Sequence, residues 1–302
     1  MFLNLIEIII LSLVQGISEF LPISSSSHLI IVSTLYEFKA SSLLIDVSLH
    51  LGSLLAIIFY FKKDLLSLKK NLKLLKLIFI GSIPIIFFGY FLYITGLINE
   101  IRNIKIIAWT TIIFGALLYV ADKTNFKRKI EPDLNLKSIF IIGLFQMLAL
   151  IPGVSRAGIT ITAGRILKFN RYDSSKISFL LSIPALAGAS AIGIKDMLSN
   201  SFEFNYLALV AIILSFLFSY FTVKFFLNYI NKFSLNIFVF YRVIVGIILL
   251  FIVYNWFFFN TGANCEKTTA NNIKIHPIIL LMFRTWFKII HAASTAKTPS
   301  KE

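Results

Sequence analysis

Long apolar runs are the feature that most constrains this chain. A helix needs about 20 mostly apolar residues to cross a bilayer. Six stretches meet that requirement, namely Leu43 to Phe61, Leu77 to Ile98, Ile104 to Ala121, Ile177 to Ile194, Tyr206 to Tyr229 and Ile237 to Phe258. Only 14% of the 302 residues are charged and the mean hydropathy is +0.86, which is too apolar for a soluble domain of this size. The sequence therefore predicts an all-α polytopic membrane protein.

Two further apolar regions are interrupted partway by proline and polar residues. Residues 2–36 break at Pro22 and the serines that follow it, and residues 138–168 break at Pro152 and Gly153. Proline removes a backbone donor and clashes with the preceding turn, so a helix stops or kinks there. Each region is therefore predicted to be a pair of short helices and not one span.

The net charge of +15 is carried largely by short loops between the apolar runs. Lysine and arginine concentrate in short cytoplasmic loops, so we interpret these charges as orientation signals and not as a nucleic-acid surface. The three basic loops run from Lys62 to Lys76, from Lys123 to Lys137 and from Arg165 to Lys176. Because the last two flank residues 138–168 and both are predicted to be cytoplasmic, that region is predicted to enter and leave from one side. Residues 2–36 are predicted to form a second re-entrant hairpin from the opposite face.

The two halves, residues 1–121 and 137–258, then have the same plan in opposite orientations. Each is a re-entrant broken-helix hairpin followed by three transmembrane helices. A short internal likeness agrees with this plan, because LSLVQGISEFLPISSSSH and IIGLFQMLALIPGVSRAG both run from an apolar helix through glutamine and proline to a serine-bearing turn. Inverted repeats with broken helices place binding sites near the bilayer midplane, so we expect an integral membrane domain over residues 1–258 with its site there.

The pattern changes in the C-terminal extension, residues 259–302. Pro277 to Ala293 is apolar but short, and it carries Arg284, Lys288 and His291, which predicts an interfacial amphipathic helix. Residues 295–302 are predicted to be a disordered tail. The single cysteine, Cys265, excludes an intramolecular disulfide and a multi-cysteine metal site.

The first break carries an acidic and hydroxyl-rich cluster. Gln15 and Glu19 are four residues apart, so they share one helix face and can hold the same ligand or metal ion. Ser25, Ser26 and His28 follow Pro22 closely, and together with Glu19 they supply a nucleophile, a proton shuttle and an acid. The serines can also cap a helix whose amide groups attract anions. The structural alternative is that the serines bond to backbone carbonyls while His28 packs.

The second break carries a guanidinium. Gly153 allows close backbone approach, Ser155 precedes Arg156 directly, and Thr160 lies four residues further on. A guanidinium beside a helix start suits bidentate recognition of phosphate. The alternative is an arginine whose head snorkels to an interface, but a break inside an apolar hairpin favours phosphate binding.

Other residues give weaker or negative signals. Asp46 and His50 share a face of the first span, where they either join the site or form a polar patch that supports helix packing. The sequence has no P-loop, dinucleotide fingerprint, His-Glu-x-x-His motif or aromatic-basic pattern, so we expect no organic cofactor and no nucleic-acid partner.

Two segments, QGISEFLPISSSSHL at residues 15–29 and ALIPGVSRAGIT at residues 149–160, resemble the signature motifs of the undecaprenyl-diphosphate phosphatase family, also called bacitracin-resistance proteins. DVSLHLG, ISFLLSIP and YRVIVGIILL also fit, so the resemblance covers about residues 1–258. It implies an enzyme of the bacterial cytoplasmic membrane that removes the terminal phosphate from a polyprenyl diphosphate at the outer face. That reaction recycles the lipid carrier for cell-wall glycans.

The resemblance also implies roles for the residues. Ser25 matches the family's nucleophile, Glu19 and Gln15 its acidic pair, Ser26 and His28 their neighbours, and Ser155 with Arg156 its phosphate-binding pair. Glutamine stands at position 15 where many members have glutamate, which weakens the case for Mg²⁺ or Ca²⁺ held by two carboxylates. Ser27 and Ala157 also depart from the commoner glycine and serine.

Two other functions fit parts of the pattern. Inverted repeats with broken helices are also a transporter architecture, so a polyprenyl-phosphate transporter or flippase is the chief alternative. A purely structural membrane subunit fits poorly with Glu19, His28 and Arg156 at membrane depth. Phosphate release from a lipid diphosphate separates the enzyme from a carrier.

Overall fold

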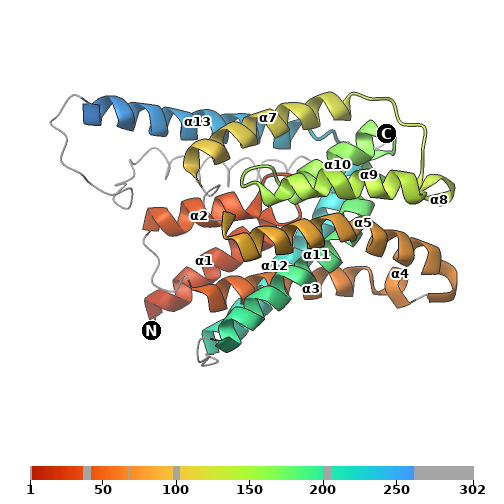
Figure 1. Cartoon of the computed structure of the whole chain (residues 1–302), viewed down its shortest axis with the longest axis horizontal. Coiled ribbons are helices and arrows are strands. Elements are labelled where there is room, and N and C mark those ends of the chain that lie inside the picture. Colours follow the sequence, from red (N-terminus) through yellow and green to blue (C-terminus); the bar gives the residue numbers. More distant parts are fainter. Residues whose placement is uncertain (1, 37–41, 67, 98–102, 200–205, 262–302) are drawn as a thin grey trace, which may run out of the picture.

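The computed structural model describes residues 2–36, 42–66, 68–97, 103–199 and 206–261, and it is helical nearly throughout these ranges (Figure 1). Its elements are α1 (Phe2–Ser18), α2 (Ser25–Tyr36), α3 (Leu43–Tyr60), α4 (Lys62–Leu66), α5 (Leu68–Thr95), α7 (Ile104–Asp122), α8 (Ile130–Asp133), α9 (Leu136–Met147), the 3₁₀ turn η1 (Leu148–Leu150), α10 (Arg156–Ile166), α11 (Arg171–Ser199), α12 (Tyr206–Ile230) and α13 (Asn236–Thr261). The predicted interfacial helix and tail lie outside the described residues.

The six predicted spans are confirmed as helices long and apolar enough to cross a membrane. They are α3, α5, α7, α11, α12 and α13. The boundaries differ most at the basic ends, because α5 begins at Leu68 and α11 at Arg171, several residues before the apolar runs begin. Lysine and arginine are good helix formers, so a helix continues past the apolar belt into the polar region. Pro84 and Pro184 lie inside α5 and α11. The chain is therefore a multi-pass membrane protein.

Two breaks interrupt the short helices where the sequence predicts them. The first break, residues 19–24, separates α1 from α2, and the second break, residues 148–155, separates α9 from α10 and contains η1. Each ends in a serine with left-handed backbone, Ser24 at φ 77° and Ser155 at φ 68°. Such a conformation costs an L-residue about 1–2 kcal/mol. The Ser155 hydroxyl offsets part of that cost by capping α10, because it accepts the Gly158 amide at 3.1 Å.

The second short-helix pair returns to the side from which it starts. Lys127 and Arg128, which precede α9, donate their amides to the Lys168 carbonyl after α10 at 2.9 and 3.0 Å. The two helices of each pair also contact each other, α1 with α2 and α9 with α10. Figure 1 shows these pairs toward opposite ends of the long axis. The breaks are thereby brought toward the middle of the bundle from two directions.

Small residues let the helices approach closely. A side chain at Gly52 of α3 would come within 2.5 Å of the Ile212 carbonyl of α12, and the adjacent Ser53 hydroxyl bonds to Ser215 and Ser219 at 3.1 and 2.9 Å. A side chain at Gly143 of α9 would come within 2.1 Å of the Gly81 carbonyl on α5. Close backbone approach and hydroxyl contacts are the usual basis of helix packing in lipid.

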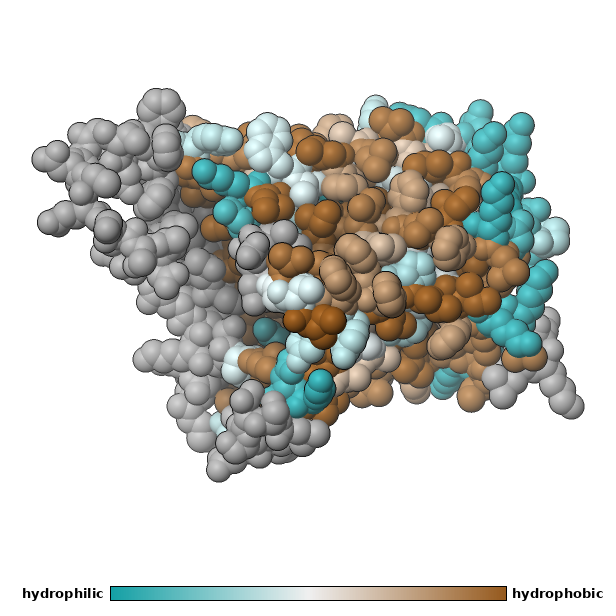
Figure 2. Space-filling view, viewed as in Figure 1, coloured by the Kyte–Doolittle hydropathy of each residue, from teal (hydrophilic) through white to brown (hydrophobic). Residues whose placement is uncertain are grey.

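Polar residues gather at one end of the molecule. On the face in view, Figure 2 shows an apolar belt across the bundle and hydrophilic residues at the end that carries α4 and α8. The Asp122 carboxylate ties this end together, because it pairs with Arg165 and Arg171 and accepts the Leu235 amide. The three basic loops of the sequence lie in this region, as the positive-inside pattern predicts.

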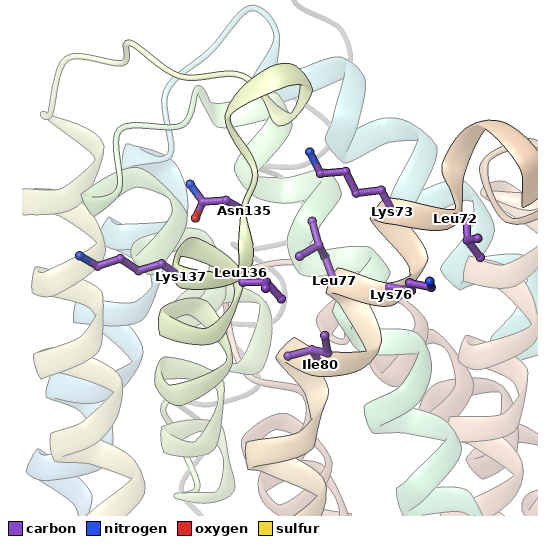
Figure 3. A pocket seen from close by; sticks show the side chains of 8 residues that line it. All are labelled: Leu72, Lys73, Lys76, Leu77, Ile80, Asn135, Leu136 and Lys137. Carbon is purple, nitrogen blue, oxygen red and sulfur yellow. The ribbon is translucent and has the colours of Figure 1, made fainter.

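A groove of 860 Å³ runs between α5 and α9 near the same end (Figure 3). Its floor is apolar and includes Leu77, Ile80 and Leu136. Lys73 and Lys137 stand at its rim, but Figure 3 shows their side chains pointing in different directions. The lysines therefore do not converge on one ligand.

Candidate active site

Glu19 is the centre of the polar cluster. It lies in the first break, and its side chain accepts three hydrogen bonds. Oε1 accepts from Arg156 Nη2 at 3.0 Å, and Oε2 accepts from Ser25 Oγ at 2.6 Å and from Gln15 Nε2 at 3.1 Å. The residue is only 7% exposed. A buried carboxylate is tolerated when it is paired and hydrogen-bonded, and here α1, the start of α2 and the start of α10 supply the partners.

Arg156 brings the second break to this carboxylate. It is the first residue of α10, directly after the strained Ser155. Besides the Glu19 carboxylate, its guanidinium donates to the Glu19 carbonyl at 3.3 Å and to the Ser178 carbonyl on α11 at 3.1 Å. The fork geometry of arginine allows these bonds at once. The predicted convergence of Glu19 and Arg156 is therefore seen as an ion pair between residues 137 positions apart.

The cluster opens into a cavity of 650 Å³. The predicted residues that line it are Glu19, Ser25, Ser26, Ser155 and Arg156. Its other walls come mainly from α3, α5 and α11, and many are apolar, including Ile85, Ile86, Leu150, Leu186 and Gly188. A polar, partly ionic floor under apolar walls suits a ligand with an anionic head and an apolar tail.

Gln15 is buried behind Glu19 and does not line the cavity. Its amide nitrogen donates to the carboxylate, while its Oε1 has no hydrogen-bond partner among the described residues. Gln15 therefore supports Glu19 from behind.

His28 is near the site but turned away from the cavity. Its Nδ1 lies 2.6 Å from the Ser24 carbonyl, and its Nε2 lies 2.6 Å from the Tyr241 hydroxyl on α13. A carbonyl only accepts, so Nδ1 carries the proton in this arrangement and Nε2 accepts from the tyrosine. Both ring nitrogens are thus used to hold the first break. The catalytic role predicted for His28 stays a prediction.

Gly153 and Thr160 support the second break from behind and do not line the cavity. Gly153 has φ +90°, and a side chain there would come within 2.1 Å of Thr110 Oγ1 and 2.7 Å of the Ile107 carbonyl. Thr160 donates to the Arg156 carbonyl at 2.8 Å and lies 2.7 Å from Ser178 Oγ. These residues fix the position of Arg156 against α7 and α11.

Asp46 and His50, whose role the sequence leaves open, both line the cavity.

Sequence reasoning missed two other groups. Tyr93 on α5 bonds to Asp196 on α11, and both line the same cavity. The other is Arg242, which lies six residues into the apolar span of α13. The sequence carries a clear signal for it, because an ionisable group inside an apolar span is a functional candidate.

The described residues form no group of three or more histidine, cysteine, aspartate or glutamate side chains that could hold a metal ion. The Glu19 oxygens already accept from Arg156, Ser25 and Gln15, and the Gln15 amide directs its nitrogen toward them. Hard cations require several oxygen ligands. This donor set does not fit a divalent ion held by the protein alone.

The fold and this cavity define a multi-pass helical membrane protein with an ionic and hydroxyl-bearing site inside its apolar bundle. A family model described as bacitracin resistance protein BacA matches residues 8–248. The chain therefore belongs to the BacA family.

Proteins named undecaprenyl-diphosphatase are similar to this chain over most of their length. The one from Pelagibacter ubique (strain HTCC1062) is 68% identical over 256 residues, which cover 84% of this chain and 100% of the relative. The one from Campylobacter curvus (strain 525.92) is 43% identical over 266 residues, or 83% and 99% of the two chains. The one from Erythrobacter litoralis (strain HTCC2594) is 36% identical over 282 residues, or 82% and 99%.

Proposed function

We propose that this chain hydrolyses undecaprenyl diphosphate to the monophosphate and inorganic phosphate, which recycles the lipid carrier for cell-wall synthesis and confers bacitracin resistance. One observation carries the proposal. The Ser25 hydroxyl donates to Glu19, Glu19 pairs with Arg156, and all three line one cavity with apolar walls. The names of the similar proteins agree with it.

In the proposed mechanism Ser25 is the nucleophile and Glu19 its general base. As Ser25 Oγ bonds to the terminal phosphorus, its proton passes to the carboxylate 2.6 Å away and the bridging P–O bond breaks. The lipid monophosphate leaves, and water then attacks the phosphoserine and releases inorganic phosphate. Arg156, Ser155 and Ser26 are proposed to contact the phosphate oxygens, because positioning and charge stabilisation supply most of the catalysis in phosphoryl transfer.

Gln15, Gly153 and Thr160 are proposed to act on the substrate through these groups. Gln15 supports the Glu19 carboxylate, and Gly153 and Thr160 hold the α10 start that carries Arg156. His28 is proposed to position the first break through Ser24 and Tyr241, and the proton-transfer role predicted from the sequence is the alternative.

We further propose that residues 1–121 and 137–258 are inverted repeats within one membrane domain, with residues 259–302 as an extension. The helix contacts support this plan. If α1 corresponds to α9 and α5 to α12, the packing of α1 on α12 has its counterpart in the packing of α9 on α5. The same plan makes α3 correspond to α11 and α7 to α13. Each of these helices contacts its own counterpart.

We propose that the protein lies in the bacterial inner membrane and that its cavity opens to the periplasmic or outer face. The cavity is lined by Leu43 at the start of α3 and by Tyr93 and Asp196 near the ends of α5 and α11, far along these helices from the basic loops. Ala189→Cys in a Cys265→Ser background should then react with a membrane-impermeant thiol reagent applied to the outer side of the inner membrane. Labelling only from the cytoplasmic side would show that the cavity opens to the cytoplasm, which would contradict this proposal.

For the metal we propose that any Mg²⁺ or Ca²⁺ enters as part of the diphosphate substrate, because Glu19 already accepts three hydrogen bonds and belongs to no group of three possible ligands among the described residues. Mg²⁺ commonly binds through one or two carboxylates and substrate phosphates. Equilibrium dialysis should accordingly find no tight divalent-ion binding without lipid diphosphate. Stoichiometric binding by the protein alone would contradict this proposal.

The proposed reaction is tested by phosphate release from undecaprenyl diphosphate by the purified protein in detergent. We expect turnover by the unaltered chain and none by Ser25→Ala, because no other hydroxyl donates to Glu19 among the described residues. Ser82→Ala is the matched control, since the Ser82 hydroxyl bonds only to the Ile78 carbonyl of its own helix. It should retain full turnover.

Two outcomes would reject the proposal in different ways. Full turnover by Ser25→Ala would reject this nucleophile. Lipid binding without phosphate release by the unaltered chain would favour the transporter or flippase.

A further inference from the structure

Arg242 is the largest of the fully buried side chains, and it lies in an apolar stretch of α13. No carboxylate lies within ion-pair distance of it among the described residues. Its partners are all backbone carbonyls. A charged group at this depth is costly unless its donors are satisfied, so its place in the bundle needs a reason.

The guanidinium binds both breaks at once. Nη1 donates to the Pro22 carbonyl of the first break at 3.3 Å, and Nη2 donates to the Gly153 and Val154 carbonyls of the second break at 3.0 Å each. Nε donates to the Thr111 carbonyl of α7 at 3.1 Å. Carbonyls at a helix break lack helical partners, and lipid offers none. One side chain therefore satisfies carbonyls from both breaks.

These carbonyls lie next to the residues of the site. Pro22 and Ser24 lead into the helix that carries Ser25, and Val154 is followed directly by Ser155 and Arg156. Arg242 does not line the cavity, so it is not in contact with the space proposed for the substrate. We propose that Arg242 is a positioning residue that fastens the two breaks together and so sets the Ser25 hydroxyl opposite the Arg156 guanidinium. Its consequence for catalysis rests on the proposed function.

The fork geometry, and not the charge alone, is what this role requires. Lysine keeps the positive charge but offers a single ammonium in place of three separated nitrogens. We expect Arg242→Lys and Arg242→Gln to lower kcat similarly, on the order of 10²-fold, since a misplacement of about 1 Å has that effect. KM should stay within about threefold, because the cavity walls are unchanged. Added guanidinium should restore part of the kcat of Arg242→Ala.

Hydrogen–deuterium exchange tests the fastening without any turnover. In Arg242→Lys, amides in residues 20–27 and 153–158 should exchange faster, while α3, α5, α11 and α12 keep their protection. Arg165→Lys is the matched control, because Arg165 is also buried and bonds to carbonyls, but at the basic end near Asp122 and Phe169. It should leave kcat and the exchange of both breaks unchanged.

A second variant disturbs the fastening while keeping Arg242. A Cβ at Gly158 would come within 2.7 Å of Arg242 Nη1, the atom that bonds to Pro22. Gly158→Ala should therefore speed exchange in residues 20–27, and this variant decides the matter if the Arg242 variants fail to fold.

The result that would overturn the inference is wild-type exchange at both breaks in Arg242→Lys and at the first break in Gly158→Ala. Wild-type kcat in Arg242→Lys would likewise reject it and leave charge as the only requirement. If the unaltered chain releases no phosphate, the proposed function fails, whereas the exchange data still decide whether Arg242 fastens the breaks.

Discussion

A single carboxylate organises the site at the scale of residues. Glu19 receives a guanidinium from the second break, a hydroxyl from α2 and an amide from α1. Removing one partner from such a buried pair usually costs about 3–5 kcal/mol, because the other charge is left uncompensated. The same contacts that make Glu19 tolerable in the bundle also set Ser25 for deprotonation.

His28 and Tyr241 give a prediction at this scale. If His28 acts by holding the first break, His28→Gln and Tyr241→Phe each remove the hydrogen bond between His28 Nε2 and the Tyr241 hydroxyl. We expect each to lower kcat roughly 5-fold, as the loss of about 1 kcal/mol implies, and the double variant to lose little more than one of them. Phosphate-release kinetics of the three variants measure this. A far larger loss for His28→Gln alone would assign it the proton transfer instead.

The sequence predicts Glu19, Ser25 and Arg156 because ionisable and hydroxyl groups stand out in apolar segments. It does not predict what His28 does. Its partner Tyr241 lies 213 residues away, and only the packing of α13 against the first break brings them together. Arg242 carries a signal of its own, but its acceptors are backbone carbonyls, which no side-chain pattern reveals.

At the scale of elements, the second break requires a glycine at one position. Gly153→Ala would combine a left-handed backbone with contacts of 2.1 Å to Thr110 Oγ1 and 2.7 Å to the Ile107 carbonyl. Gly96 also has a positive φ, +71°, but a Cβ there would meet no atom within 4 Å. Gly96→Ala therefore measures the cost of the left-handed backbone alone. We expect about 1–2 kcal/mol of destabilisation for Gly96→Ala and clearly more for Gly153→Ala, together with loss of phosphate release. Thermal unfolding in detergent compares them, and equal stability of the two variants would contradict the account.

That a helix exists is easier to predict from the sequence than the residues at which it begins and ends. All six spans follow from apolar length, whereas α5 and α11 begin several residues early, because basic residues extend the helices beyond the apolar belt. Helix α1 ends at Ser18, four residues before Pro22, and the Glu19 amide still donates to the Gln15 carbonyl at 3.0 Å. Side-chain partners from other elements decide such details.

At the scale of the whole molecule, the central claim is that the two breaks form one site. Glu19 lies in the first break and Arg156 directly follows the second, and their ion pair of 3.0 Å joins the two inside the bundle. The apolar belt and the polar end place the surrounding helices in the membrane, and Arg242, which does not line the cavity, binds both breaks.

A double-mutant cycle on phosphate release tests this claim most directly. Glu19→Gln and Arg156→Gln are each expected to lower kcat on the order of 10²–10³-fold, since the first removes the general base of Ser25 and the second removes the guanidinium proposed to contact the transferred phosphate. Residues that act as a unit are strongly non-additive, so the double variant should be only slightly slower than the worse single variant. If instead the two losses multiply, Glu19 and Arg156 act independently and the breaks do not form one site.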